Sequence, residues 1–244
     1  MKNLINDISE NHTKNVVICC QETWKYNLPN NFKKQFCNKY HFIHQSAMDA
    51  GTAQRRGRPF GGVCFIISKA VAFKVIYSNA RCISIVLSDY NILLNNVYLP
   101  FNDSRKSSEQ NLENMLEALG HLDAAHNLST ETIDNITLGD FNVSPNDTTQ
   151  RAFLFIQWRH DHSYGYIDLN YLPPNEYSHK SGRLIDRFVS TTHIGNDVEN
   201  VKILKEHLSS DHFPIVASIR ANISQTVAHK KNPYINWNKA SKNP

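Results

Sequence analysis

An acid and an amide, Asp140 and Asn142, stand directly after a short apolar run that ends at Leu138 and Gly139. The run 136–138 is typical of a buried β-strand, and Gly139 lets the backbone turn or approach another group closely. Residues two positions apart point to the same side of an extended chain, so both polar side chains would face one site. Gly-Asp-x-Asn alone is more typical of an Asx turn that closes a strand, so a catalytic interpretation depends on other polar residues.

Two more polar side chains occur at the ends of apolar runs. Glu22 follows the run 16–20, which predicts a buried strand, and Tyr98 lies near the end of the run 92–99. The alternative for Glu22 is a solvated strand end. A tyrosine in the position of Tyr98 is more often a core or rim residue than a catalytic one.

An aspartate and a histidine further along the chain suggest a pair. Asp186 interrupts the apolar run 184–189, and a buried carboxylate without a partner would be costly. Asp211 and His212 precede the apolar run 215–219. If His212 reaches Asp186, the carboxylate fixes the imidazole tautomer and raises its pKa, which leaves a cationic donor for a phosphate oxygen.

A basic, glycine-rich loop spans residues 54–62 and contains Arg55, Arg56 and Arg58. Such a loop suits the phosphate backbone of a nucleic acid. A solvated hairpin connection is an equally physical interpretation.

Length and composition predict one domain over residues 1–220, followed by a basic tail over residues 221–244. The 244-residue chain is 41% hydrophobic and carries a net charge of +4, which permits a polyanionic partner without requiring one. Its five cysteines form no Cys-x-x-Cys pair, which favours a reducing compartment over a disulfide framework. With no long apolar N-terminal run and no run of membrane-spanning length, we expect a soluble, intracellular protein without a membrane partner.

The elements that must position these residues alternate between strands and helices. Apolar runs at 16–20, 40–45, 63–67, 72–77, 82–87 and 92–99 predict strands, and the four from residue 63 onward predict an antiparallel meander. Ser107 and Gln110 form a capping box before a helix, on which Leu112, Met115, Leu116, Leu119 and Leu122 form a core stripe. A strand follows at 135–138, which gives the alternation of a layered α/β domain.

Short motifs, taken in their order along the chain, resemble those of the endonuclease/exonuclease/phosphatase family, and most closely the apurinic-endonuclease-like domain of LINE-type (non-LTR) retrotransposons. They occupy residues 21–24, 57–63, 96–100, 138–142, 185–187 and 210–214. The resemblance covers residues 16–219, and residues 235–240 resemble the connector that leads to a reverse transcriptase. It implies a four-layer α/β sandwich, in which two mainly antiparallel β-sheets pack face to face with helices outside.

The resemblance also assigns roles around a metal and a water molecule. Glu22 would bind Mg²⁺, for which Mn²⁺ is a possible substitute, and Asp211 would lie near the metal or the leaving group. Asp140 would orient or deprotonate the attacking water. Asn142 would hold that water or the scissile phosphate.

Further roles concern the phosphate and the DNA. His212, oriented by Asp186, would stabilise charge in the transition state, and Tyr98 would contact the phosphate. Ser178 matches a hydroxyl position that touches the DNA backbone. These roles together describe hydrolysis of a phosphodiester bond without a covalent nucleophile.

One departure from the family concerns the N-terminus. The family normally begins with a β-strand that carries an asparagine supporting the metal site, and the residues before Glu22 contain no counterpart; Asn6 lies in an expected helix. We therefore expect the usual first strand to be missing. Such a loss would expose a neighbouring strand edge and remove a support that commonly matters about 10–100-fold.

The expected function is Mg²⁺-dependent nicking of double-stranded DNA that leaves a 3′-hydroxyl, by a retrotransposon-derived, monomeric and nuclear protein. In the parent element, a reverse transcriptase would be its partner. An alternative is a catalytically weak or inactive nucleic-acid-binding remnant. A phospholipid or inositol-phosphate phosphatase of the same fold is less favoured, because Phe141 and Arg187 lie in motifs of nuclease character.

Overall fold

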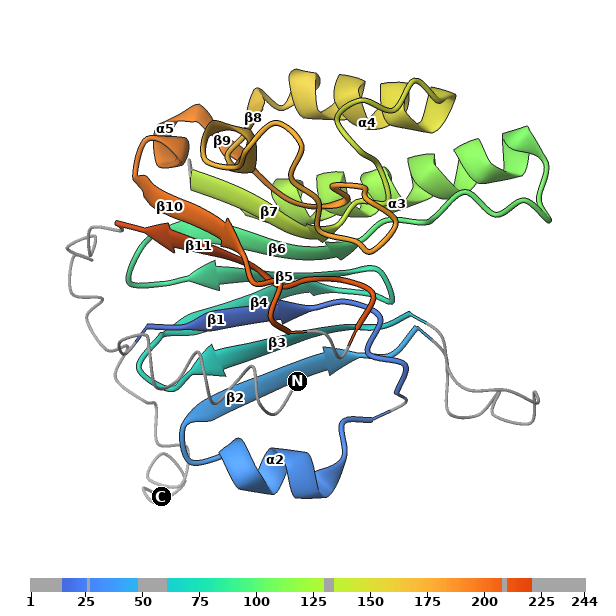
Figure 1. Cartoon of the computed structure of the whole chain (residues 1–244). Coiled ribbons are helices and arrows are strands. Elements are labelled where there is room, and N and C mark those ends of the chain that lie inside the picture. The colour runs from blue at the N-terminus through green and yellow to red at the C-terminus, as the bar shows by residue number, and fades with distance from the viewer. Residues whose placement is uncertain (1–14, 26, 48–60, 130–133, 208–209, 221–244) are drawn as a thin grey trace, which may run out of the picture.

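The computed structural model describes residues 15–25, 27–47, 61–129, 134–207 and 210–220. It forms four layers, in which two facing groups of strands lie between outer helices (Figure 1). This arrangement confirms the expected α/β sandwich. In the described ranges, no helix is both long and apolar enough to cross a membrane.

The larger sheet has six strands in the order β4-β5-β6-β7-β9-β8. Its outer face is covered by α3 (Ser108–Leu128) and α4 (Gln150–Asp161) (Figure 1). A short helix α5 (Thr192–Gly195) follows β9, and a 3-10 turn η2 (Asp168–Asn170) follows β8. The strands are β4 (Phe73–Ser78), β5 (Cys82–Leu87), β6 (Ile92–Tyr98), β7 (Asp134–Asp140), β8 (Tyr164–Tyr166) and β9 (Asp186–Thr191).

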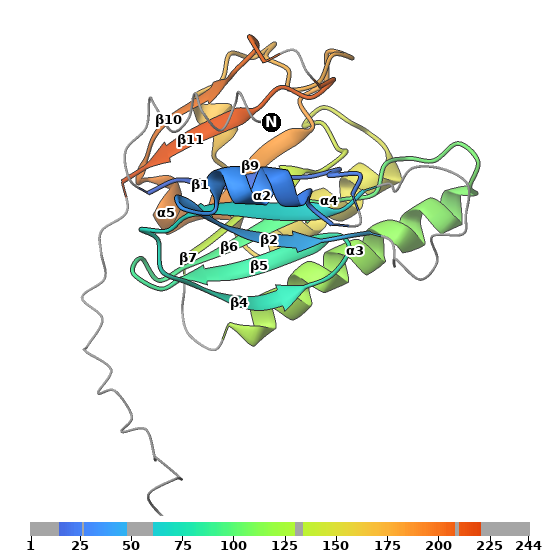
Figure 2. The same ribbon diagram turned by 90° about the horizontal axis from the view of Figure 1, so that it is seen from below.

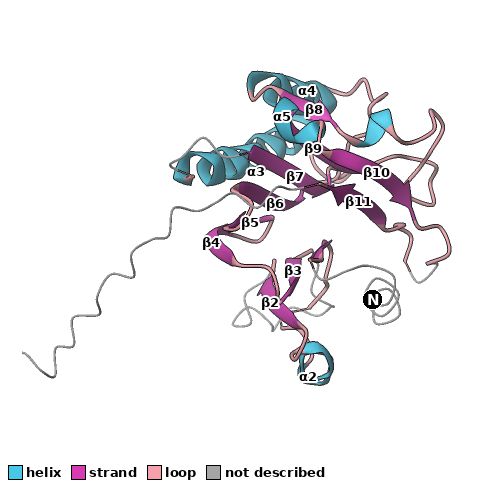
Figure 3. Ribbon diagram, turned by 90° about the vertical axis from the view of Figure 1, so that its left-hand side faces the viewer, coloured by secondary structure: helices cyan, strands magenta, loops and turns pink. Residues whose placement is uncertain are grey.

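Two smaller sheets complete the sandwich. A three-stranded sheet has the order β1-β3-β2 and is covered by α2 (Asn30–Phe36) (Figure 2). A two-stranded sheet, β10-β11, lies at the side of the molecule (Figure 3). These strands are β1 (Val17–Cys20), β2 (Tyr40–Gln45), β3 (Val63–Ser68), β10 (Val198–Ile203) and β11 (Ile215–Ile219).

The predicted four-stranded meander is wrong in one strand. β4, β5 and β6 do pair in sequence as antiparallel neighbours, but β3 pairs with β1 and β2 in the opposite sheet. Five of the six β3 residues are buried, so this strand is covered on both faces. Such a continuous apolar run identifies a central strand but does not specify the sheet to which it belongs.

Helix α3 begins as predicted and buries a narrower stripe than predicted. Ser107 and Gln110 form the reciprocal capping box, and Met115, Leu119 and Leu122 are buried. Leu116 is 53% exposed, which corrects its assignment to the core. It lies at the edge of the helical stripe and beside exposed Phe153 of α4, where no sheet covers it.

The crossover through α3 makes β6 and β7 parallel neighbours, as a strand–helix–strand unit requires. The register pairs Tyr98 with Asp140, and the next pairing, with β9, places Asp140 opposite Asp186. Backbone pairing alone thus brings three of the predicted site residues to one edge of the larger sheet, where the last residues of β6 and β7 meet the first residue of β9.

Gly139, at this edge, cannot be replaced without strain. Its φ is +142°, and a Cβ atom would lie 2.0 Å from the Val97 carbonyl oxygen of the adjacent strand. We expect Gly139→Ala to lower the free energy of unfolding by roughly 3–5 kcal/mol, the sum of backbone strain and overpacking. Urea denaturation followed by circular dichroism measures this change.

The matched control for Gly139→Ala is Gly120→Ala, in the middle of α3. No heavy atom lies within 4 Å of a Cβ added at Gly120. Alanine there should stabilise the protein by about 0.5–1 kcal/mol, because it costs less backbone entropy in a helix. Equal effects of the two substitutions would contradict the close approach at Gly139.

Candidate active site

Glu22 and Tyr98 meet although they come from facing sheets. The Tyr98 hydroxyl donates a hydrogen bond of 2.6 Å to Oε1 of Glu22. Burial, followed by this hydrogen bond, raises the pKa of Tyr98 well above its usual range, so the phenol keeps its proton. Glu22 is therefore held at the larger sheet's edge rather than left as a solvated strand end.

The backbone that carries Glu22 is strained and is fixed by two glycines. Glu22 and Trp24 have positive φ angles of 49° and 53°. The amide of Trp24 donates to the Gly61 carbonyl over 3.0 Å, and that of Thr23 donates to the Gly62 carbonyl over 3.2 Å. Strain of this kind persists only where the surroundings hold it, and it is concentrated at functional sites.

A second contact between the sheets lies immediately behind Glu22. Asn96 is fully buried and donates to the Cys64 carbonyl over 2.8 Å, while Gln21 donates to the Asn96 side-chain oxygen over 2.5 Å. Both residues lie in the motifs of the sequence, yet neither was predicted as a site residue. An uncharged amide in a strand gives no signal for this role until its facing sheet is known.

Asp140 and Asn142 form one unit. Asn142 donates to the two Asp140 carboxylate oxygens, from its backbone amide over 2.9 Å and from Nδ2 over 3.1 Å. Nδ2 also donates to the Leu99 carbonyl over 2.8 Å, so both of its hydrogens are used and Oδ1 remains as an acceptor. The predicted pair therefore does share a site, and Asn142 orients Asp140.

The environment of Asp140 adjusts its affinity for a proton. Only 2% of the residue is exposed, and this burial, with the nearby charge of Asp186, raises its pKa to about 7 against the opposing effect of His212. The charge of Glu22 raises it further. A carboxyl group of this kind can accept a proton near neutral pH.

His212 and Asp186 pair as predicted from the sequence. Nδ1 of His212 lies 3.0 Å from Oδ1 and 2.9 Å from Oδ2 of Asp186. Burial favours the neutral ring, but the hydrogen bond to Asp186 and the charges of Asp186, Asp140 and Asp211 together outweigh it and raise the pKa of His212 to about 9. The imidazole is thus a cation at neutral pH, and Nε2 is available as a donor.

We expect the metal-free protein to show this directly in a histidine titration. By NMR in the presence of EDTA, His212 should titrate near pH 9, and in Asp186→Asn its midpoint should fall toward about 6.5. Because the folded-state pKa is raised, the pair stabilises the fold fully below about pH 6.5, and this stabilisation is lost as pH rises through about 9. A wild-type midpoint below 7 would contradict the pairing.

Ser178 positions Asp186 from within the protein. Its side chain is fully buried, and the hydroxyl oxygen accepts hydrogen bonds from the amides of Ile185 over 3.1 Å and Asp186 over 3.0 Å. The backbone that begins β9 is fixed by these bonds. The contact between Ser178 and DNA stays a prediction, and the geometry adds a structural role to it.

Asp211 lies beside a histidine that the sequence did not single out. Nε2 of His179 is 3.6 Å from the Asp211 carboxylate, and the rings of His179 and His212 meet edge to face with centroids 4.7 Å apart. His179 and His212 are also joined by an isolated antiparallel bridge. A histidine in the loop 176–183 has no periodic pattern around it, so only the three-dimensional arrangement reveals it.

Among the described residues, two groups of side chains could hold a metal ion. One consists of Asp140, Asp186 and His212, and the other of His179, Asp211 and His212. Glu22 belongs to neither group. The carboxylates and the Asn142 amide oxygen at this edge are the hard oxygen donors that Mg²⁺ and Mn²⁺ prefer, so the donor set fits such an ion.

The arginines Arg55, Arg56 and Arg58 lie outside the described residues, as do Asn6 and the tail 221–244. Their predicted roles stay predictions.

No protein-family model matches the sequence, and no curated protein matches it. Solved structures do share its fold. The 3′ phosphatase NExo from Neisseria, bound to a product DNA hairpin, has a TM-score of 0.65 at 15% identity, over 90% of this chain and 93% of that one. An AP endonuclease from Archaeoglobus fulgidus has a TM-score of 0.66 at 17% identity, over 89% and 93% of the two chains. The APE2 catalytic domain from Xenopus laevis has a TM-score of 0.63 at 15% identity, over 90% and 87%. The chain therefore has the fold of AP endonucleases and related DNA-processing enzymes.

Proposed function

We propose that this chain is a metal-dependent endonuclease that hydrolyses a phosphodiester bond in double-stranded DNA and leaves a 3′-hydroxyl. The observation that carries the proposal is the convergence of three hydrogen-bonded pairs at one sheet edge: Glu22 with Tyr98, Asp140 with Asn142, and Asp186 with His212. Solved structures with this fold include proteins described as an AP endonuclease and a 3′-5′ exonuclease. A fold shared at this identity supports the class of reaction without specifying the substrate.

The chain's own groups divide the work of hydrolysis. Asp140 accepts the proton of the attacking water, and Oδ1 of Asn142 accepts a hydrogen bond that holds this water in place. Nε2 of His212 donates to a phosphate oxygen as negative charge develops. Glu22 would hold Mg²⁺, as the sequence resemblance implies, and the bound ion would polarise the phosphate and neutralise charge.

The order of the sequence motifs supports an origin in a LINE-type retrotransposon, where the nick would prime a reverse transcriptase. We further propose that Arg55, Arg56 and Arg58 bind the DNA backbone, and that the protein acts as a monomer in the nucleus.

The proposal is tested by nicking of supercoiled plasmid. In about 5 mM Mg²⁺, nicked, open-circular plasmid should accumulate. EDTA should reduce its rate of formation to background. Mg²⁺ or Mn²⁺ added in excess should restore it, because the oxygen donors of the site accept either ion. The ends should be extended by a DNA polymerase, as a 3′-hydroxyl allows.

Other outcomes of this assay identify the alternatives. Nicking that continues unchanged in EDTA would overturn the metal requirement. Retention of plasmid in a gel-shift assay without any nicking would indicate a binding remnant. Release of phosphate from an inositol phosphate, with intact plasmid, would indicate a phosphatase.

A further inference from the structure

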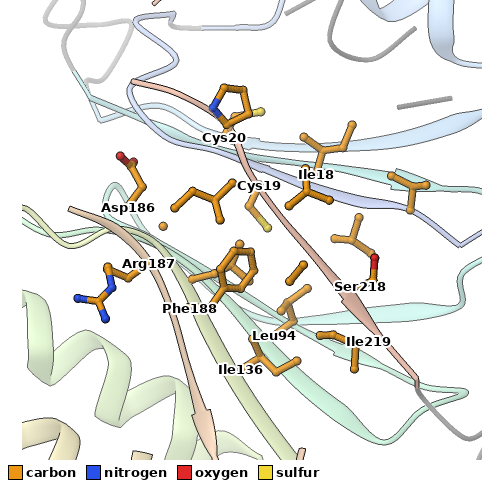
Figure 4. Close-up of a pocket in the computed structure, with 18 of the residues that line it drawn as sticks. Ile18, Cys19, Cys20, Leu94, Ile136, Asp186, Arg187, Phe188, Ser218 and Ile219 are labelled. Carbon is orange, nitrogen blue, oxygen red and sulfur yellow. The ribbon is translucent and has the colours of Figure 1, made fainter. Parts of the chain in front are cut away.

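Within the part of the chain that the structure describes, strands β1 and β11 each have one unpaired edge, and the two edges face a common cavity. Among the described strands, β1 pairs with β3 alone and β11 with β10 alone. The cavity between them has a volume of about 950 Å³ and is lined by residues 15–21 and 213–219 along both strands. Figure 4 shows Ile18 and Cys19 of β1 on one side of it and Ser218 and Ile219 of β11 on another.

The backbone groups of β1 that face this cavity follow from the ladder. The Ser68 amide donates to the Val16 carbonyl over 2.9 Å, so this pair is a hydrogen-bonded one. Antiparallel ladders alternate hydrogen-bonded and non-hydrogen-bonded pairs. Val17 and Cys19 therefore direct their N–H and C=O groups away from β3 and toward the cavity.

The backbone groups of β11 that face the cavity follow from its ladder with β10. The Leu204 amide donates to the Pro214 carbonyl over 2.8 Å, which makes the next pair, Ile203 with Ile215, a non-hydrogen-bonded one. Ile215 and Ala217 then direct their amide and carbonyl groups into the cavity from the other side. Backbone donors and acceptors left without partners in such a place are costly.

The wall between the two edges is apolar. Leu94, Ile136 and Phe188 of the larger sheet line the cavity and belong to the buried cluster against which Val17 and Cys19 of β1 pack (Figure 4). Side chains on one face of an inserted strand would therefore meet an apolar surface. A helix could not satisfy two parallel rows of backbone groups, whereas an extended chain presents donors and acceptors on both of its edges.

We propose that this cavity binds an extended segment of a partner polypeptide, which adds as a β-strand between β1 and β11 and joins the two small sheets into one. The segment carries apolar side chains at alternate positions, directed at the wall of the larger sheet. It spans about six residues, or about 20 Å.

One end of the inserted strand opens onto the candidate active site. The last residue of β1 lies two positions before Glu22, and the first residue of β11 lies three positions after His212. β1 and β11 therefore run in opposite directions, and whichever way the segment runs, one pairing is parallel and the other antiparallel. Strand binding at this cavity would hold whether or not the site cleaves DNA.

Amide hydrogen exchange tests the proposal on the full chain. The probe is a segment of about six residues that alternates threonine with valine or isoleucine. It is attached to the N-terminus of the chain through a flexible linker of about 20 Gly and Ser residues. This linker gives the probe an effective concentration on the order of millimolar at the cavity. Exchange at Val17, Cys19, Ile215 and Ala217 should slow about tenfold or more. The amides of Ile18 and Val216, which already bond to β3 and β10, should change much less.

Two controls make the result specific. A probe with proline at its centre cannot complete the ladder and should give no protection. Ala217→Pro in the chain removes a cavity-facing donor but leaves the β10 ladder intact, and it should weaken protection by the unmodified probe. Exchange that is unchanged at both edges would overturn the proposal, and so would amides at Val17 and Ala217 that are already as slow as those of Ile18 and Val216 without the probe.

Discussion

Asp140→Asn is expected to lower the rate of plasmid nicking by about 10²–10⁴-fold, the range typical of a lost general base. Asp140 is buried, and its carboxylate accepts hydrogen bonds from the backbone and side chain of Asn142. Asparagine keeps the size of the side chain but cannot accept the proton of the attacking water. The loss should therefore appear in the rate of cleavage, measured under single-turnover conditions, and not in DNA binding.

Stability measurements separate this catalytic loss from unfolding. Burial raises the pKa of Asp140 to about 7, so the ionised carboxylate is unfavourable in the folded state at higher pH. A neutral amide avoids that penalty, and Asp140→Asn should unfold at the same urea concentration as the wild type or a higher one. The control is Asp161→Asn, because Asp161 is an exposed acid at the end of α4 whose contacts are with Gln157 and His160 of the same helix. Nicking by Asp140→Asn at the wild-type rate would overturn its role as base.

The site residues at the strand ends could be predicted because polar side chains there interrupt or end runs of apolar residues. Asp186 interrupts an apolar run, and a buried carboxylate requires a partner, so its pairing with His212 followed from elementary energetics. Asp140 and Tyr98 likewise stand where apolar runs end, and the structure brings them to one edge. Such positions can be predicted from the sequence because burial of a polar side chain in an apolar strand costs free energy unless a hydrogen bond or an opposite charge compensates it.

Other features depended on contacts that no local pattern encodes. The sequence of β3 is typical of a buried strand and would suit either sheet. Its place in the three-stranded sheet is decided by pairing with β1 and β2. Ser178 and His179 lie in a loop without periodicity, yet one fixes the backbone at Asp186 and the other contacts Asp211. Leu116 is a residue for which the local pattern was misleading. Helical spacing placed it at the margin of the apolar stripe, but the packing of α3 left it exposed.

Removal of the His212 imidazole is expected to lower the nicking rate by about 10²–10³-fold, the effect of losing one preorganised donor to a developing oxyanion. The ring is held by Asp186 through Nδ1, which directs Nε2 outward. Asp186→Asn should also slow the reaction, because the amide no longer holds the ring as a cation. Both substitutions should leave the affinity for DNA nearly unchanged, since the interaction develops in the transition state.

A double-mutant cycle decides whether the two residues act as one unit. If Asp186 acts through His212, the double variant His212→Ala with Asp186→Asn should be no slower than His212→Ala alone, so the two effects are not additive. His193 and Asp134 supply a matched pair of the same residue types, with Nδ1 and Oδ2 3.3 Å apart at the opposite end of β7. The equivalent substitutions there should leave the rate within about twofold of the wild type. Additive losses at His212 and Asp186 would instead show that Asp186 contributes by a separate route, such as direct coordination of the metal with Asp140, which the geometry of these three side chains also permits.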